Sequence, residues 1–204
     1  MTTKIRLLLA EDQAMVRGAL VALLELEGDL EVVAQVGRGD EIAAAVAAHR
    51  PDVALLDIEL PGLDGIAAAA QIRKAAPSTK VLMLTTFGRP GYLRRAMEAG
   101  ASGFLVKDGP ASDLAAAIRR IVAGERVVDS QLAADALMAG DNPLTPRERD
   151  VLRAAADGST VTAVSQALHL SEGTVRNYLS SGIGKTGAAN RIEAARRADE
   201  LGWL

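Results

Sequence analysis

The chain lacks cysteine and any long apolar run. Without cysteine among its 204 residues it can form neither a disulfide framework nor a thiolate metal site, which is compatible with a reducing cytosol. Near the N-terminus, Lys4 and Arg6 accompany an apolar run of only about four residues. That run is far shorter than a membrane span or the apolar region of a signal peptide. These absences predict a soluble protein that stays in the cytoplasm.

A strong excess of charge of one sign is also absent. The net charge of −3 lies within residues 1–140, whereas residues 141–204 are neutral. Neither part is therefore a basic domain. Within 171–197, however, five basic residues face two acidic ones and leave a local charge of +3. This modest basic stripe is weaker than the footprint of most nucleic-acid binders.

Residues 4–123 alternate between apolar strands and amphipathic helices. This alternation, repeated five times, predicts a doubly wound, five-stranded parallel sheet with right-handed crossovers, an α/β fold. Helices are expected between the strands and after the last one, at about 15–26, 41–49, 64–72, 92–99 and 112–123. The predicted strands are 5–10, 30–36, 53–57, 80–84 and 103–106.

Three carboxylates follow two of these strands. Glu11 and Asp12 come directly after the first strand, and Asp57 ends the third. Because open α/β sheets place their ligand sites at the carboxyl ends of the strands, the three are expected to converge. Such a cluster is unfavourable unless a cation neutralises it, and carboxylate oxygens suit Mg²⁺. The plain alternative is that Asp57 only caps the turn before Pro61-Gly62.

Thr85 and Lys107 end the fourth and fifth predicted strands, on the same edge as the carboxylates. The plain alternative is that Thr85 is only a hydroxyl at the end of a strand and Lys107 only a solvated cation. An aspartate that accepts a phosphoryl group, however, needs a metal, a hydroxyl donor and an ammonium group around the phosphoryl oxygens. The sequence offers all three at matching positions.

Residues 4–123 resemble the receiver domains of bacterial two-component response regulators. The resemblance covers Glu11-Asp12, Asp57 with Leu60-Pro61-Gly62, Thr85, and the stretch 100–107 with Phe104 and Lys107. It implies a CheY-like, flavodoxin-like sheet of order 2-1-3-4-5, phosphorylation of Asp57 by a sensor histidine kinase, and Thr85, Phe104 and Lys107 as switch and phosphoryl-binding residues. It also implies Mg²⁺ held by Asp12, Asp57 and the backbone carbonyl of Glu59, with Glu11 acting through water.

The pattern loosens between residues 124 and 143, which we interpret as a linker between a domain at 1–123 and a second at 144–204. The second domain opens with Thr145-Pro146-Arg147-Glu148. This stretch predicts a helix start with Thr145 as N-cap, Pro146 at the first helical position and Glu148 closing a capping box. Helices are expected to follow at about 161–168, 172–185 and 191–201. Four short helices with tight turns favour a helix-turn-helix unit.

Residues 144–197 resemble the LuxR-type DNA-binding domain of NarL/FixJ regulators, through the stretches 144–152 and 170–176, Lys185 and Asn190-Arg191. The resemblance implies promoter DNA as a partner, with Arg176, Asn177 and Ser180 facing base edges and Thr174, Lys185 and Arg191 meeting phosphates. Gly182 and Thr186 depart from the family, which has aliphatic residues there. Gly182 and Gly184 each weaken a helix by about 1 kcal/mol, so we expect the end of this helix to fray without DNA.

The leading hypothesis is a phosphorylation-controlled transcription regulator, not an enzyme. One alternative is a phosphotransferase or phosphatase with Asp57 as nucleophile; another is a phosphorylation-dependent protein-interaction switch whose DNA-binding domain is degenerate. The stretches 85–92, 174–178 and 190–203 resemble the DesR branch of the family, which implies control of membrane-lipid desaturation genes.

Dimerisation on phosphorylation is expected, because one helix-turn-helix reads only a few base pairs and two copies on adjacent half-sites are the usual solution. The candidate surface combines the first and last helices of the first domain. Each carries apolar residues at helical spacing, although these could equally pack on the sheet. The candidates are Met15, Ala19, Leu23, Leu114, Ile118 and Ile121.

Overall fold

The computed structural model describes residues 4–86, 88, 90–138 and 142–204. Its contacts divide the chain into two compact units, residues 1–88 with 95–133 and residues 89–94 with 134–204. Across the described ranges, no helix has the length and apolar character needed to cross a membrane.

The first unit is built on a parallel sheet of order β2-β1-β3-β4-β5-β6. This confirms the predicted doubly wound α/β fold and extends it by one strand. The strands are β1 (Ile5–Ala10), β2 (Leu30–Val36), β3 (Val53–Asp57), β4 (Lys80–Thr85), β5 (Gly103–Val106) and β6 (Val127–Val128). The connecting helices are α1 (Ala14–Glu25), α2 (Ile42–His49), α3 (Gly65–Ala75), α4 (Pro90–Ala99) and α5 (Ala111–Val122), with the short 3-10 turn η1 (Gly39–Glu41) before α2.

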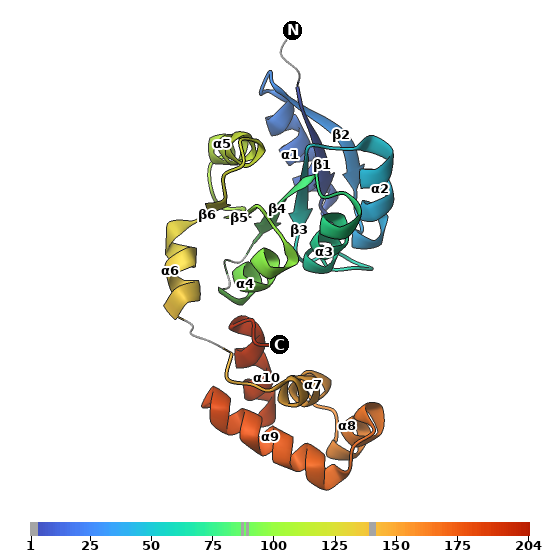
Figure 1. The fold of residues 1–204 in the computed structure, drawn as a ribbon, viewed down its shortest axis with the longest axis vertical. Helices are drawn as coiled ribbons and strands as arrows, with labels where there is room; N and C mark the ends of the chain where they lie inside the picture. The colour runs from blue at the N-terminus through green and yellow to red at the C-terminus, as the bar shows by residue number, and fades with distance from the viewer. Residues whose placement is uncertain (1–3, 87, 89, 139–141) are drawn as a thin grey trace. The chain divides into compact units, whose positions relative to one another are not determined.

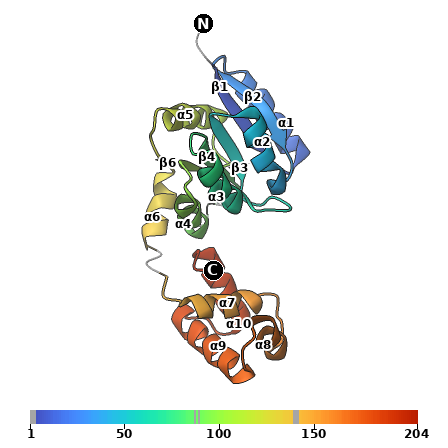
Figure 2. The same cartoon turned by 45° about the vertical axis from the view of Figure 1, so that its right-hand side comes forward.

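Helices cover both faces of the sheet (Figures 1 and 2), with α1 and α5 on one face and α2 and α3 on the other. All five residues of β3 are buried, as expected for a strand at the centre of a parallel sheet. The core beneath α1 and α5 joins Leu7, Leu9, Leu55, Leu82, Ile118 and Ile121.

The sixth strand and a helix lie in the segment predicted to be a linker. Gly124, at φ +92°, reverses the chain after α5, and Val127 then pairs with Gly103 and packs into the core. Helix α6 (Ser130–Met138) starts where the carboxylate of Asp129 accepts a hydrogen bond from Leu132 N. A strand of two residues is too short to show the alternation of apolar and polar residues that identifies a strand, so β6 could not be predicted from the sequence.

The second unit holds α7 (Pro146–Ala154), α8 (Val161–Leu168), α9 (Glu172–Thr186) and α10 (Arg191–Glu200). Its core includes Val151, Leu152, Val175, Ala194 and Trp203. The predicted capping box is confirmed: Thr145 Oγ1 accepts from Glu148 N, and Glu148 accepts from Thr145 N at 2.7 Å. Helix α7 begins at Pro146 as predicted, and α8, α9 and α10 match their predicted ranges within one residue at each end.

Candidate functional site

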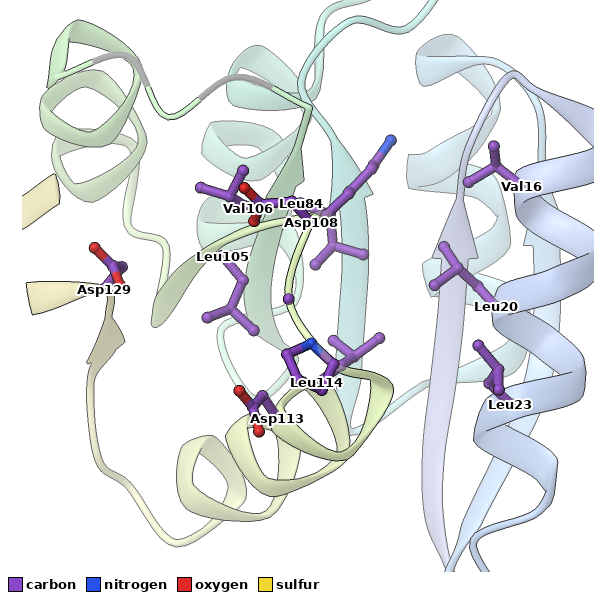
Figure 3. Close-up of a pocket in the computed structure, with 13 residues that line it drawn as sticks. Val16, Leu20, Leu23, Leu84, Leu105, Val106, Asp108, Asp113, Leu114 and Asp129 are labelled. Carbon is purple, nitrogen blue, oxygen red and sulfur yellow. The ribbon is translucent and has the colours of Figure 1, made fainter. Parts of the chain in front are cut away.

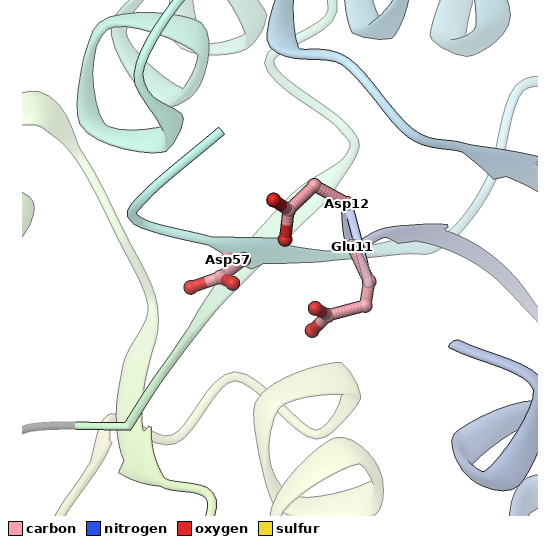
Figure 4. A group of neighbouring side chains, drawn as sticks. All are labelled: Glu11, Asp12 and Asp57. Atoms are coloured by element: carbon pink, nitrogen blue, oxygen red, sulfur yellow. The ribbon is translucent and has the colours of Figure 1, made fainter. Parts of the chain in front are cut away.

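An acidic cluster lies at the carboxyl ends of β1 and β3. The two strands are neighbours, with Ala10 opposite Leu56, so the residues that follow Ala10 lie beside Asp57. One carboxylate oxygen from each of Glu11, Asp12 and Asp57 falls within 4.8 Å of the others (Figure 4). Glu11 is 1 % exposed and Asp57 5 %, whereas Asp12 is open to solvent. The convergence expected from strand order is therefore present.

Lys107 bridges two of these carboxylates. Its Nζ donates to Glu11 Oε2 at 2.6 Å and to Asp57 Oδ2 at 2.7 Å. Burial alone would lower the pKa of Lys107, but its hydrogen bonds to Asp57 and Glu11 outweigh burial and raise the pKa. The side chain is therefore a permanent ammonium group. It supplies one positive charge to a cluster that holds three negative ones.

The turn after β3 is shaped to bring the backbone close to Asp57. Gly65 N donates to Ile58 O at 2.9 Å, and a Cβ on Gly65 would lie only 1.9 Å from Asp57 O, so only glycine fits there. Asp64 caps α3 by accepting from Ala67 N at 2.7 Å. Glu59, the expected source of a metal-binding carbonyl, donates its backbone N–H toward Asp57 Oδ1 at 3.4 Å, a long hydrogen bond. Asp57 thus lies against a closely packed turn.

Thr85 and Phe104 lie on the neighbouring strands. Thr85 ends β4 and is 3 % exposed, and its carbonyl accepts from Lys107 N at 2.8 Å. The hydroxyl-bearing residue and the ammonium-bearing residue are therefore joined through the backbone. Phe104, in β5, is completely buried. Thr85 thus lies at the carboxyl end of its strand, whereas Phe104 pairs with Met83 within the sheet, two residues before Thr85 on β4.

A cavity of about 400 Å³ adjoins Lys107 on the face covered by α1 and α5 (Figure 3). Leu20 and Leu23 line it from α1, and Leu105 and Leu114 from β5 and α5. The cavity thus lies between α1 and the N-terminal part of α5.

The predicted dimer surface is corrected for α5. Leu114 is 9 % exposed, and Ile118 and Ile121 are completely buried in the core between α5 and the sheet. These three residues therefore form the core-facing stripe of the helix. On α1 the outcome differs, because Met15 is 88 % and Leu23 43 % exposed and Ala19 is open to solvent. An apolar surface is therefore available on α1 alone among the predicted candidates.

In the second unit, α9 presents the residues expected to face base edges. Arg176, Asn177 and Ser180 are exposed on it, while Val175 and Leu179 are buried on its opposite side. The Arg176 guanidinium is held by Glu172, four residues earlier, at 2.7 Å. The surface of α9 is thus polar and accessible, as a recognition helix requires.

The residues expected to meet phosphates have protein partners. Thr174 shares a hydrogen bond with the Ser171 hydroxyl, and Arg191 donates to the carbonyl of Gly158 at 3.2 Å. Lys185 donates to the Glu148 carboxylate at 2.7 Å. Sequence reasoning gave Glu148 only its role in the capping box, because the contact with Lys185 depends on how α7 and α9 pack.

Glu148 is a buried, ionised carboxylate. Burial would raise its pKa, but hydrogen bonds from Lys185, Ser181 and Thr145 outweigh this and hold the pKa at about 2. Its partners satisfy both carboxylate oxygens, as a buried charge requires.

Helix α9 is continuous to Thr186. A Cβ on Gly182 would approach the Leu152 side chain to 3.0 Å, so the small residue allows α7 and α9 to pack closely. Thr186 stands where the family has an apolar residue, and its hydroxyl donates a hydrogen bond to Gly182 O at 2.8 Å. The two departures from the family pattern thus fit the packing of this helix.

The comparisons with known proteins agree with both units. Residues 7–119 match the response regulator receiver domain, and residues 142–198 match the bacterial regulatory proteins of the luxR family. The chain therefore belongs to the two-component response regulators that join a receiver domain to a LuxR-type DNA-binding domain.

Full-length relatives share this organisation. The transcriptional regulatory protein YvfU of Bacillus subtilis is 48 % identical over 98 % of this chain and 100 % of its own. The transcriptional regulatory protein DesR of the same organism is 44 % identical over 98 % of this chain and 99 % of its own. A crystal structure of the response regulator ChrA, from a heme-sensing two-component system, is 32 % identical over 98 % of this chain and 99 % of that one, with a TM-score of 0.59. These relatives are regulators of the same family.

Replacing Lys107 should destabilise the first unit. Lys107→Ala leaves two buried carboxylates without their cation, and breaking a buried ion pair in this way costs about 3–5 kcal/mol. Denaturant unfolding followed by circular dichroism measures the loss. Lys74→Ala, at an exposed position on α3, is the control and should change stability little. Equal losses in the two variants would contradict the bridging role.

Proposed function

We propose that this chain is a cytoplasmic transcription factor controlled by phosphorylation of Asp57. The observation that carries the proposal is the Lys107 ammonium group, which touches Asp57 and Glu11 within a cluster of three carboxylates. We assign the phosphoacceptor domain to residues 1–123, the connection to 124–143 and the DNA-binding domain to 144–204. The partners are a sensor histidine kinase and promoter DNA. By resemblance to the DesR branch, membrane-lipid desaturation genes are candidate targets.

The acidic cluster fits Mg²⁺. Three carboxylates lie within 4.8 Å of one another, and a single ammonium group offsets only part of their negative charge. A divalent cation would complete the neutralisation. Asp12, Asp57 and the Glu59 carbonyl would hold it, with Glu11 acting through water. The ion would supply charge neutralisation for the phosphoryl oxygens.

The chain's own residues have distinct tasks in the transfer. A carboxylate oxygen of Asp57 attacks the phosphorus atom of the donor, and the bond from phosphorus to the donor's leaving atom breaks. Lys107 lies within hydrogen-bond distance of Asp57 and exchanges its bond to Glu11 for a phosphoryl oxygen. Thr85 is drawn toward Asp57 and its hydroxyl donates to another phosphoryl oxygen, and Phe104 reorients. These changes bias a two-state arrangement of the nearby helices.

Asp57→Asn should abolish incorporation of acid-labile phosphate from acetyl phosphate in Mg²⁺, because an amide is neither a nucleophile nor a good metal ligand. Labelled phosphate bound to the protein is the measurement. Asp52→Asn, at the opposite end of β3, is the matched control and should be labelled as the wild type is. Label that persists on the Asp57 variant would place the acceptor elsewhere.

Arg176→Ala should weaken specific DNA binding by about 1–3 kcal/mol and relax preference at one base position, as expected for a bidentate base contact. Binding to a set of single-base operator variants measures both effects. Arg196→Ala is the control, since Arg196 has the same exposed pairing at 2.7 Å, with Glu200 on α10. Equal, sequence-independent losses in both variants would mean that α9 is not the recognition helix.

Phosphorylation should produce a homodimer through α1. Met15, Ala19 and Leu23 supply an exposed apolar surface there, so a charge introduced at Met15 or Leu23 should prevent pairing without disturbing the core. Sedimentation of the full chain with Mg²⁺ and a phosphoryl mimic should give a dimer for the wild type and a monomer for Met15→Glu and Leu23→Glu.

Ile192→Glu is the control for this experiment, because Ile192 is 52 % exposed and lies in the other unit. It should dimerise as the wild type does. A wild-type chain that stays monomeric with the mimic would exclude dimerisation as the mechanism and favour release of the DNA-binding domain by the receiver.

A further inference from the structure

The Glu148 carboxylate connects the start of α7 to the C-terminal half of α9. Its Oε1 accepts from Ser181 Oγ at 2.6 Å, and its Oε2 accepts from Lys185 Nζ and Thr145 N, both at 2.7 Å. The residue is only 4 % exposed. One side chain thus closes the capping box of one helix and at the same time binds two residues of another.

This half of α9 is also held by packing, since Ile183 lies against the core of the second unit and Thr186 is buried. Gly182 and Gly184 contribute no side chains, and Gly182 allows Leu152 of α7 to pack directly on the helix. Ser181 and Lys185, one turn apart, lie on the side that faces Glu148. The polar contact therefore adds to the apolar packing between α7 and α9. Together with this packing, it fixes which residues of α9 face α7.

We propose that Glu148 is a positioning residue for DNA recognition, and that Lys185 is its internal partner rather than a phosphate contact. The proposal rests on the DNA-binding function above and revises the role expected for Lys185 from the sequence. Ser180, next to Ser181, and Asn177, one turn earlier, are exposed on the other side of α9, so fixing Ser181 and Lys185 also fixes the residues offered to base edges.

Two roles of Lys185 predict different salt dependence. A lysine that neutralises a phosphate contributes about one unit to the slope of log affinity against log salt concentration. A lysine held by Glu148 contributes nothing to this slope. Lys185→Ala should therefore leave the salt slope unchanged while lowering the specific affinity, and Lys185→Arg should restore the specific affinity because arginine can keep the ion pair.

Glu148→Gln provides the second test. Glutamine can keep its oxygen at Thr145 N and donate its amide N–H to the Ser181 hydroxyl, so the fold should survive, but it loses the charge that holds Lys185. The freed lysine can then reach a phosphate. We expect a salt slope steeper by about one unit and a several-fold lower ratio of specific to non-specific affinity. Adding Lys185→Ala to Glu148→Gln should return the slope to the wild-type value.

The experiment measures binding of the full chain to a specific and an unrelated duplex across a series of salt concentrations. Fluorescence of Trp203, the single tryptophan and a core residue of the second unit, verifies that each variant is folded. A slope flattened by about one unit in Lys185→Ala, or unchanged slope and specificity in Glu148→Gln, would overturn the proposal. A wild-type chain without sequence preference would instead overturn the DNA-binding function and this inference with it.

Discussion

The first unit depends on a single ammonium group held between two buried carboxylates. Glu11, Asp57 and Lys107 come from three different strand ends, and the parallel topology alone brings them to one edge of the sheet. Two carboxylates this close and this buried repel each other and are poorly solvated, and the lysine supplies the positive charge that offsets this. The same constraint makes the site responsive: a new anion on Asp57 must compete for the same ammonium group.

The second unit contains a comparable arrangement with a different consequence. Glu148 is also buried and paired with a lysine. Hydrogen bonds from Ser181 and Thr145, however, satisfy its remaining carboxylate acceptor positions within the protein. The cluster around Asp57 has an exposed carboxylate, Asp12, and more negative than positive charge. An electrostatically complete site is suited to fixing a helix, whereas an incomplete one is suited to binding a ligand.

The sequence predicted the sheet, its acidic edge and the helix boundaries of the second unit, because periodicity, strand-end position and capping chemistry are local signals. It could not predict β6, since two residues show no period, and Asp129 was not recognised as the cap of α6. The spacing of Leu114, Ile118 and Ile121 shows an apolar stripe but not whether sheet or partner covers it. The pairing of Lys185 with Glu148 joins residues 37 positions apart and depends on tertiary packing.

We expect Lys107 to exchange a carboxylate partner for a phosphoryl oxygen when Asp57 is modified. The most direct measurement is a crystal structure of the full chain with Mg²⁺ and a phosphoryl mimic on Asp57. In that structure Lys107 Nζ should contact the mimic and should have moved away from Glu11 Oε2, which lies 2.6 Å from it in the unmodified chain. A Lys107 that keeps its bond to Glu11 and makes no contact with the mimic would contradict this expectation.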